Sequence, residues 1–72
     1  MPAATIIGID LGGTKTAIAR YAAATLQKQA EERMLTRAKD GFAAVLDDIV
    51  AAVEKLRTPH TTSIGIGVRS FS

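Results

Sequence analysis

The chain has 72 residues, with nine basic and seven acidic side chains and a formal net charge of +2. Because these charges form no cluster along the sequence, they do not indicate binding to a nucleic acid or to a membrane surface. With no cysteine and one histidine, neither disulfides nor an evident structural metal compensate for the small core of so short a chain. No apolar run approaches the roughly 20 residues of a membrane span, and no basic signal-peptide start is present. We therefore expect a cytoplasmic chain of at most one domain, and its length favours a fragment of a larger protein.

Residues 5–9, TIIGI, are rich in β-formers and nearly continuously apolar. This pattern predicts a central strand covered on both faces, which ends near Asp10 and the pair Gly12-Gly13. Residues 15–21 alternate and predict a second strand, so that the two strands would form a hairpin around the glycine pair. The two faces of the second strand would carry Thr16, Ile18 and Arg20 on one side, and Ala17, Ala19 and Tyr21 on the other.

Residues 22–37 leave two alternatives open. Their alanine, leucine, glutamine, lysine, glutamate and methionine residues are good helix formers. Leu26, Ala30 and Met34, however, form only a thin apolar stripe, and strand pairing can override a weak local preference.

Residues 40–56 predict an amphipathic helix, because apolar side chains recur at three-and-four spacing. Asp40 is expected to cap its first turn, Lys55 and Arg57 suit the last turn, and Thr58-Pro59 ends it. The apolar positions are Phe42, Val45, Leu46, Ile49, Val53 and Leu56.

Residues 62–68, TSIGIGV, predict another strand whose glycines either form a bulge or let another group approach the backbone. A strand, a helix and a further strand indicate an α/β fold with a crossover connection. Asp40, Asp47 and Asp48 are expected on a solvated helix face or cap, and His60 in a loop without a special role.

The turn that follows the first strand contains Asp10, Gly12, Gly13, Thr14 and Lys15. Backbone amides in a glycine-rich turn can hold an anion, and the threonine hydroxyl and the lysine can add donors to a phosphate. Asp10 could hold Mg²⁺ against the same phosphates, directly or through water. The alternative is a plain hairpin turn with a solvated aspartate at the strand end.

Two better-known nucleotide motifs do not fit this turn. A P-loop places lysine before threonine and opens a helix, whereas here Thr14 precedes Lys15 and β-patterned residues follow. The dinucleotide fingerprint requires another glycine spacing and also a helix.

The stretch from Ile7 to Lys15, IGIDLGGTK, resembles the first phosphate motif of the sugar-kinase, actin and Hsp70 superfamily. The version DLGGTK is most similar to the ROK family of bacterial sugar kinases, which include glucokinases and N-acetylhexosamine kinases, and of related transcriptional repressors. The family continues with a hairpin, a third strand, a helix and a strand similar to residues 64–68. The resemblance thus covers nearly all of residues 1–72. It implies part of a ribonuclease-H-like, actin-like ATPase domain in the order β-β-β-α-β, with residues 26–37 as the third strand.

The resemblance also implies roles for the turn residues. Asp10 would lie beside the phosphates of ATP and their Mg²⁺, while Gly12, Gly13 and Thr14 would surround the β- and γ-phosphates with Lys15 nearby. The reaction would transfer the γ-phosphoryl group of ATP to a hydroxyl of a hexose, mainly by positioning and charge stabilisation. The Asn-Asp motif that supplies the catalytic base in the family is absent, as is its His/Cys zinc motif.

After Val68 the chain reads RSFS, whereas the family continues with a proline and a glycine into a sugar-contacting loop. With the second domain also missing, the implied function is the N-terminal part of an ATP-dependent sugar kinase that is inactive alone. The alternative is the sugar-sensing part of a ROK repressor. Only four residues precede the first strand, which leaves no room for a DNA-binding module and favours the kinase.

Overall fold

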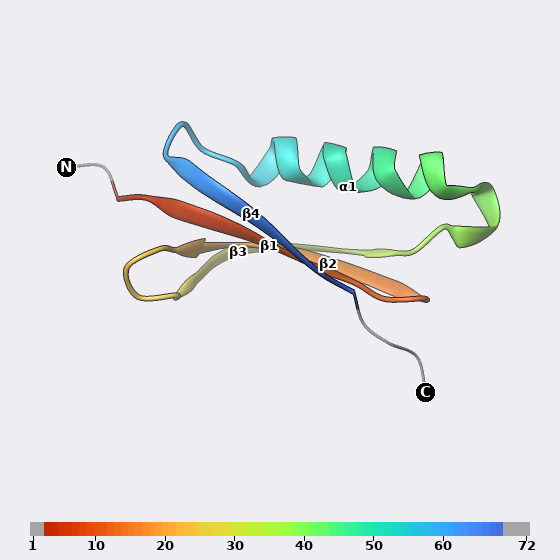
Figure 1. Ribbon diagram of the computed structural model, residues 1–72, viewed down its shortest axis with the longest axis horizontal. Helices are drawn as coiled ribbons and strands as arrows, with labels where there is room; N and C mark the ends of the chain where they lie inside the picture. Colours follow the sequence, from red (N-terminus) through yellow and green to blue (C-terminus); the bar gives the residue numbers. More distant parts are fainter. Residues whose placement is uncertain (1–2, 69–72) are drawn as a thin grey trace.

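The computed structural model describes residues 3–68, in which four strands and one helix form two layers. The strands are β1 (Thr5–Leu11), β2 (Lys15–Ala22), β3 (Lys28–Leu35) and β4 (Thr61–Val68). A short 3-10 turn at Ala38–Asp40 leads into the helix α1 (Phe42–Leu56). The extents of 44 × 25 × 15 Å suit one sheet covered by one helix (Figure 1).

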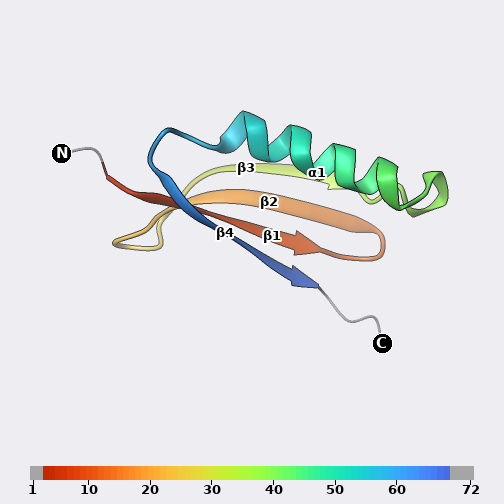
Figure 2. The same cartoon turned by 45° about the horizontal axis from the view of Figure 1, so that its top comes forward.

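The sheet is mixed, with the strand order β3-β2-β1-β4. β1 and β2 are antiparallel and form the expected hairpin, with Leu11 opposite Thr16 next to the turn. β3 is antiparallel to β2, and β4 is parallel to β1. β3 and β4 therefore run in the same direction at opposite edges, and α1 connects them across one face of the sheet (Figure 2). The α/β class predicted from the sequence is confirmed.

The core lies between α1 and one face of the sheet. Alternation along β1 and β2 turns every second side chain toward the helix, and these side chains are buried. The buried cluster consists of Ile7, Ile9, Ile18, Val45, Ile49, Ala52 and Leu56.

The other face of the sheet is not covered by any element of residues 3–68. Ile6, Gly8 and Asp10 of β1 point to this open face and are half-buried. The prediction that the first strand is covered on both faces was therefore wrong for the described part of the chain. The continuous apolar run did identify a central strand, but a single helix can cover only one face of the sheet.

Residues 28–35 form a strand, so the strand alternative for this segment is confirmed and the helix alternative is wrong. The strand is shorter than the range 26–37, because Leu26 lies in the preceding turn with a φ of 60°. Pairing with β2 satisfies the backbone groups along one side of this segment and turns Ala30 and Met34 toward the core. Tertiary pairing thus overrides a local preference for helix.

The helix differs from its predicted form at the N-terminal end. Asp40 does not cap it, because Asp40 belongs to the preceding 3-10 turn and Gly41 occupies the N-cap without a side-chain hydrogen bond. The carboxylate of Asp40 instead accepts a hydrogen bond of 3.3 Å from Arg37. At the other end, Arg57 follows the last helical residue and its backbone N–H donates to Val53, as the stop at Thr58-Pro59 predicted.

Part of the predicted apolar stripe of α1 is exposed. Phe42 is 71% exposed and Leu46 42% exposed, although both belong to the three-and-four pattern. The reason is the position of the helix, which contacts β2 and β3 and leaves β4 beside it uncovered.

No helix in residues 3–68 is long and apolar enough to cross a membrane. The departure of residues 69–72 from the family pattern lies outside the described residues.

Candidate phosphate-binding turn

The hairpin between β1 and β2 carries every residue predicted for the site. The backbone N–H of Gly12 donates to the carbonyl oxygen of Lys15 over 3.0 Å and closes the turn. Gly13 and Thr14 form its exposed tip, and Lys15 begins the returning strand. The turn thus projects beyond the sheet on the side where β1 ends.

Gly12 is required by the turn itself. A Cβ atom at this position would lie 2.7 Å from the carbonyl oxygen of Lys15, closer than real side chains approach. Gly12 does not adopt a left-handed conformation, so crowding explains the glycine here. Its amide is already used inside the turn and is therefore no donor for an anion.

Thr36, which the sequence analysis did not single out, holds the turn in place. Its hydroxyl donates to the carbonyl oxygen of Gly12 over 2.8 Å. Its backbone N–H donates to the carbonyl oxygen of Thr14, also over 2.8 Å. The buried hydroxyl of Thr16 lies 2.6 Å from the hydroxyl of Thr36. Because the proton of Thr36 is directed to Gly12, Thr16 is the donor of this second bond. No local pattern could reveal this role, since Thr36 is 24 residues from Gly12.

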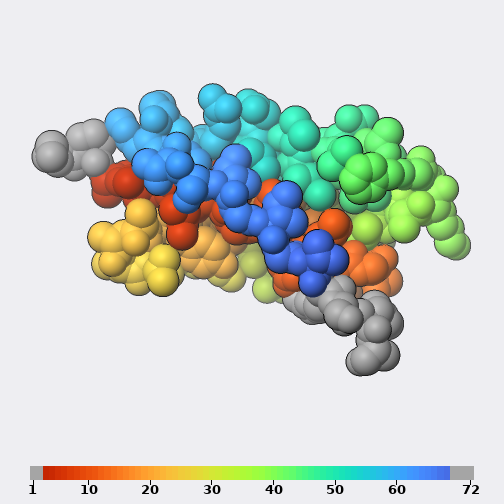
Figure 3. Space-filling view, viewed as in Figure 1, coloured from red at the N-terminus to blue at the C-terminus, as the bar shows by residue number. Residues whose placement is uncertain are grey.

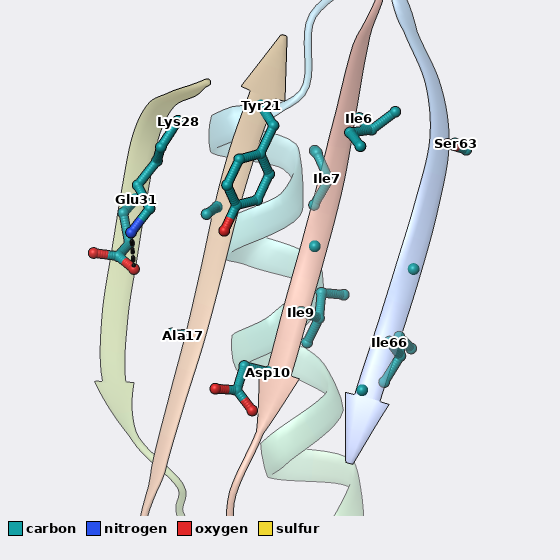
Figure 4. A pocket seen from close by; sticks show the side chains of 14 residues that line it. Ile6, Ile7, Ile9, Asp10, Ala17, Tyr21, Lys28, Glu31, Ser63 and Ile66 are labelled. Carbon is teal, nitrogen blue, oxygen red and sulfur yellow. Dashed lines mark hydrogen bonds and ion pairs between the residues drawn. The ribbon is translucent and has the colours of Figure 1, made fainter. Parts of the chain in front are cut away.

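Asp10 and Lys15 lie on the same side of the sheet. Both belong to the alternate positions that point to the open face, and both line a shallow hollow of about 550 Å³ beside the turn. The neighbours of Asp10 across the sheet are Ala17 on β2 and Gly67 on β4. The carboxylate therefore lies between two small residues, and Figure 4 shows it pointing to the side away from α1.

Small residues continue across this face and form a smooth floor. Gly8 lies between Ala19 and Gly65, and the hollow that extends from Asp10 over this floor measures about 640 Å³. β4 continues its register with β1 through Gly65 and Gly67, so the bulge alternative for these glycines is wrong. A Cβ atom at Gly65 would meet open space. The alternative in which another group approaches the backbone stays a prediction.

Glu31 and Arg33 also reach this face, from β3. The carboxylate of Glu31 accepts a hydrogen bond of 3.1 Å from Lys28 and one of 3.0 Å from Arg33. The hydrogen bond from Lys28, aided by Arg33, lowers the pKa of Glu31 below its ordinary value, against a smaller effect of desolvation. The hollow beside the turn is therefore lined by two acids, Asp10 and the ionised Glu31, and by two cations, Lys15 and Arg33. Only the strand assignment of residues 28–35 could have placed Glu31 and Arg33 there.

The residues present are compatible with Mg²⁺ held by one carboxylate. Asp10 supplies the hard oxygen ligand that Mg²⁺ prefers, and residues 3–68 contain no group of three acidic, histidine or cysteine side chains that could enclose a metal. Mg²⁺ commonly keeps several waters and uses one or two carboxylates together with phosphate oxygens. Within the described residues, a metal held by one carboxylate together with phosphate oxygens is therefore the arrangement that suits the side chains present.

Apart from Asp10 and Glu31, no acidic residue and no histidine among residues 3–68 lines the hollow beside the turn. Asp48 on α1 forms a two-point ion pair with Arg37, with distances of 2.8 and 2.9 Å. The hydrogen bond from Arg37 lowers the pKa of Asp48, with desolvation as a smaller opposing effect. His60 is exposed in the loop before β4, and its backbone N–H donates to the hydroxyl of Thr58.

No protein-family model and no curated protein sequence matches this chain.

Proposed function

We propose that this chain carries the first phosphate-binding segment of an ATP-dependent sugar kinase of the ROK type. The observation that carries the proposal is the position of Asp10. It lies one residue before the end of the central strand, on the open face, beside a glycine turn that Thr36 holds in place and on the same side as Lys15. The strand order and the β-β-β-α-β succession are compatible with part of a ribonuclease-H-like domain of the actin-like ATPases. The link to that domain is an analogy of fold and motif.

The residues of the turn have distinct proposed roles. The amides of Gly13 and Thr14 and the Thr14 hydroxyl donate to phosphate oxygens, while Gly12 shapes the turn from which they project. Lys15 neutralises phosphate charge on the open face. Asp10 orients Mg²⁺ directly or through a bound water. Bound Mg²⁺ would supply charge neutralisation for phosphoryl transfer.

The second substrate would be a hexose, and the residues described here do not provide the general base for its hydroxyl. The sequence contains no asparagine, so the Asn-Asp motif that carries this base in the family has no counterpart. We therefore propose that the 72 residues bind MgATP weakly and catalyse no transfer by themselves. A cytoplasmic location follows from the substrate, because MgATP is a cytoplasmic metabolite.

The test is a titration of the ¹⁵N-labelled chain with ATP, with and without Mg²⁺, followed by amide chemical shifts. We expect saturable shifts at residues 10–16, and we expect Asp10→Asn to weaken the Mg²⁺-dependent binding about tenfold or more, since a single carboxylate is the protein ligand. Glu31→Gln is the matched control, because this acid lies on the same face but on β3, opposite Ala19 and outside the glycine turn.

Two results would contradict the proposal. One is the absence of saturable shifts at millimolar MgATP in a folded chain, and the other is an equal effect of Asp10→Asn and Glu31→Gln. A coupled assay of ADP release with candidate hexoses tests inactivity separately. Turnover by the wild-type chain above that of Asp10→Asn would show that the chain is an active kinase.

A further inference from the structure

The outer edge of β4 is open. β4 lies at the end of the strand order, and within residues 3–68 it pairs only with β1. Every residue from Thr62 to Val68 is exposed, whereas every residue of β1 next to it is buried or half-buried. Figure 3 shows β4, in blue, running across the visible surface of the molecule beside α1. An edge strand presents a row of backbone donors and acceptors that another strand can use.

The two edges of the sheet differ in their protection against pairing. β3 carries four charged side chains among eight residues. Charged side chains are a device that keeps an edge strand from pairing with other chains. β4 has no charged residue and no proline, so two β4 edges can meet without like-charge repulsion. The charged β3 side chains are Lys28, Glu31, Glu32 and Arg33.

The sequence of β4 is nearly symmetric about Ile66. It reads Ile64-Gly65-Ile66-Gly67-Val68, so a reversed copy places a β-branched residue opposite each β-branched residue and glycine opposite glycine. Residues that face each other in an antiparallel pair lie on the same side of the sheet, where β-branched pairs stabilise the pairing. The strand is therefore complementary to itself in one register.

We propose that β4 pairs antiparallel with β4 of a second copy of this chain, centred on Ile66, to form a two-fold symmetric dimer with a continuous eight-stranded sheet. Ile66 of the two copies would face each other on the axis, and Ile64 would face Val68 of the partner subunit. A two-fold interface uses the same surface on both copies, as this symmetry requires. Pairing would satisfy the backbone donors and acceptors along the outer edge of β4 in both copies. The charged β3 strands would then lie at the two ends of the sheet.

The apolar side chains beside β4 agree with this arrangement. Ile64, Ile66 and Val68 lie in register with the core residues of β1, hence on the helix side of the sheet, yet they are exposed because α1 does not extend over them. Lys55 of α1 pairs with Glu32 on the β3 side, so the exposed Leu46 and Val50 belong to the opposite flank of the helix. The dimer brings two such apolar surfaces together on one side of the sheet, which reduces their contact with water.

The test is sedimentation equilibrium of the full 72-residue chain from about 10 μM to about 1 mM, a range in which mass action shifts a weak dimer. We expect a monomer–dimer equilibrium. Ile66→Lys places two like charges against each other on the axis and should weaken the dimer at least about tenfold. Leu35→Lys is the matched control on the other edge strand, since Leu35 is 69% exposed and Ile66 is 63% exposed. It should leave the dimer unchanged.

Hydrogen exchange provides a readout that does not depend on the variants. Amides of residues 62–68 should become more protected as the concentration of wild-type chain rises, while those of residues 28–35 should not. A monomer at every concentration would overturn the proposal, as would equal weakening by the two lysine variants. Oligomers larger than a dimer would overturn the closed two-fold arrangement.

Discussion

The hydroxyl of Thr36 donates to the carbonyl oxygen of Gly12 over 2.8 Å and thereby ties the end of β3 to the turn between β1 and β2. The same residue receives a hydrogen bond from Thr16 and donates its backbone N–H to Thr14. The candidate phosphate-binding turn is thus held from behind by a third segment of the chain. Its shape depends on tertiary contacts in addition to its glycines.

Replacing Thr36 by valine should loosen this turn. The change keeps the side-chain shape but removes the hydroxyl, which leaves the Gly12 carbonyl and the buried Thr16 hydroxyl without this partner. We expect the free energy of unfolding to fall by about 1–2 kcal/mol, measured by urea denaturation. Thr25→Val is the control, because the exposed hydroxyl of Thr25 makes only a 3.3 Å contact with the amide of Gln27. Equal effects of the two changes would contradict the bracing role.

Gly12→Ala and Gly65→Ala should change stability in opposite directions. A Cβ atom at Gly12 meets a backbone oxygen at 2.7 Å, so the turn must shift, and we expect a loss of about 1–3 kcal/mol. A Cβ atom at Gly65 meets open space, and alanine restricts the unfolded chain, so we expect a gain of up to about 1 kcal/mol. Thermal denaturation of both variants at low concentration tests the pair. A tolerated alanine at Gly12 would show that the turn has another shape.

Stability should decline in acid partly because of Asp48. The hydrogen bond from Arg37 lowers the pKa of Asp48 in the folded state, so its contribution is present above the unfolded pKa and is lost as the pH falls through the folded pKa. We expect Asp48→Asn to flatten the decline of unfolding free energy between neutral pH and about pH 3, since the unfolded carboxyl titrates near 3.9. Asp47→Asn, one residue earlier and exposed, should keep the wild-type decline. High salt should reduce the difference between wild type and Asp48→Asn.

Arg20 is a charged residue on the core side of β2, and its hydrogen bond to the end of α1 explains this position. Its Nη1 donates to the carbonyl oxygen of Leu56 over 2.7 Å and satisfies one of the unpaired carbonyls at the end of α1. Arg20→Met keeps most of the apolar stem, so we expect a loss of about 1–2 kcal/mol in unfolding free energy from the missing hydrogen bond. Gln29→Ala is the control, because Gln29 accepts only the second bond of Arg20 at the exposed surface, at 2.9 Å. A similar loss in both variants would place the main contribution of Arg20 at Gln29.

Features that depend on near neighbours in the chain could be predicted from the amino-acid sequence. The alternation in residues 15–21 predicted both faces of β2, and the glycine pair after Asp10 predicted the hairpin. The helical period of residues 40–56 predicted α1 and its end. Such patterns can be recognised without a fold, because the periods of 2.0 and 3.6 residues are properties of the local backbone.

Where these elements lie and what covers them depends on contacts between distant segments of the chain. Residues 28–35 became a strand because β2 offered a pairing edge, and this pairing then brought Glu31 and Arg33 to the face of Asp10. The place of α1 over β2 and β3 decided that Phe42 stays exposed while Val45 is buried. Hydrogen bonds and burial between distant segments depend on the whole arrangement of the sheet, so a local pattern cannot specify them.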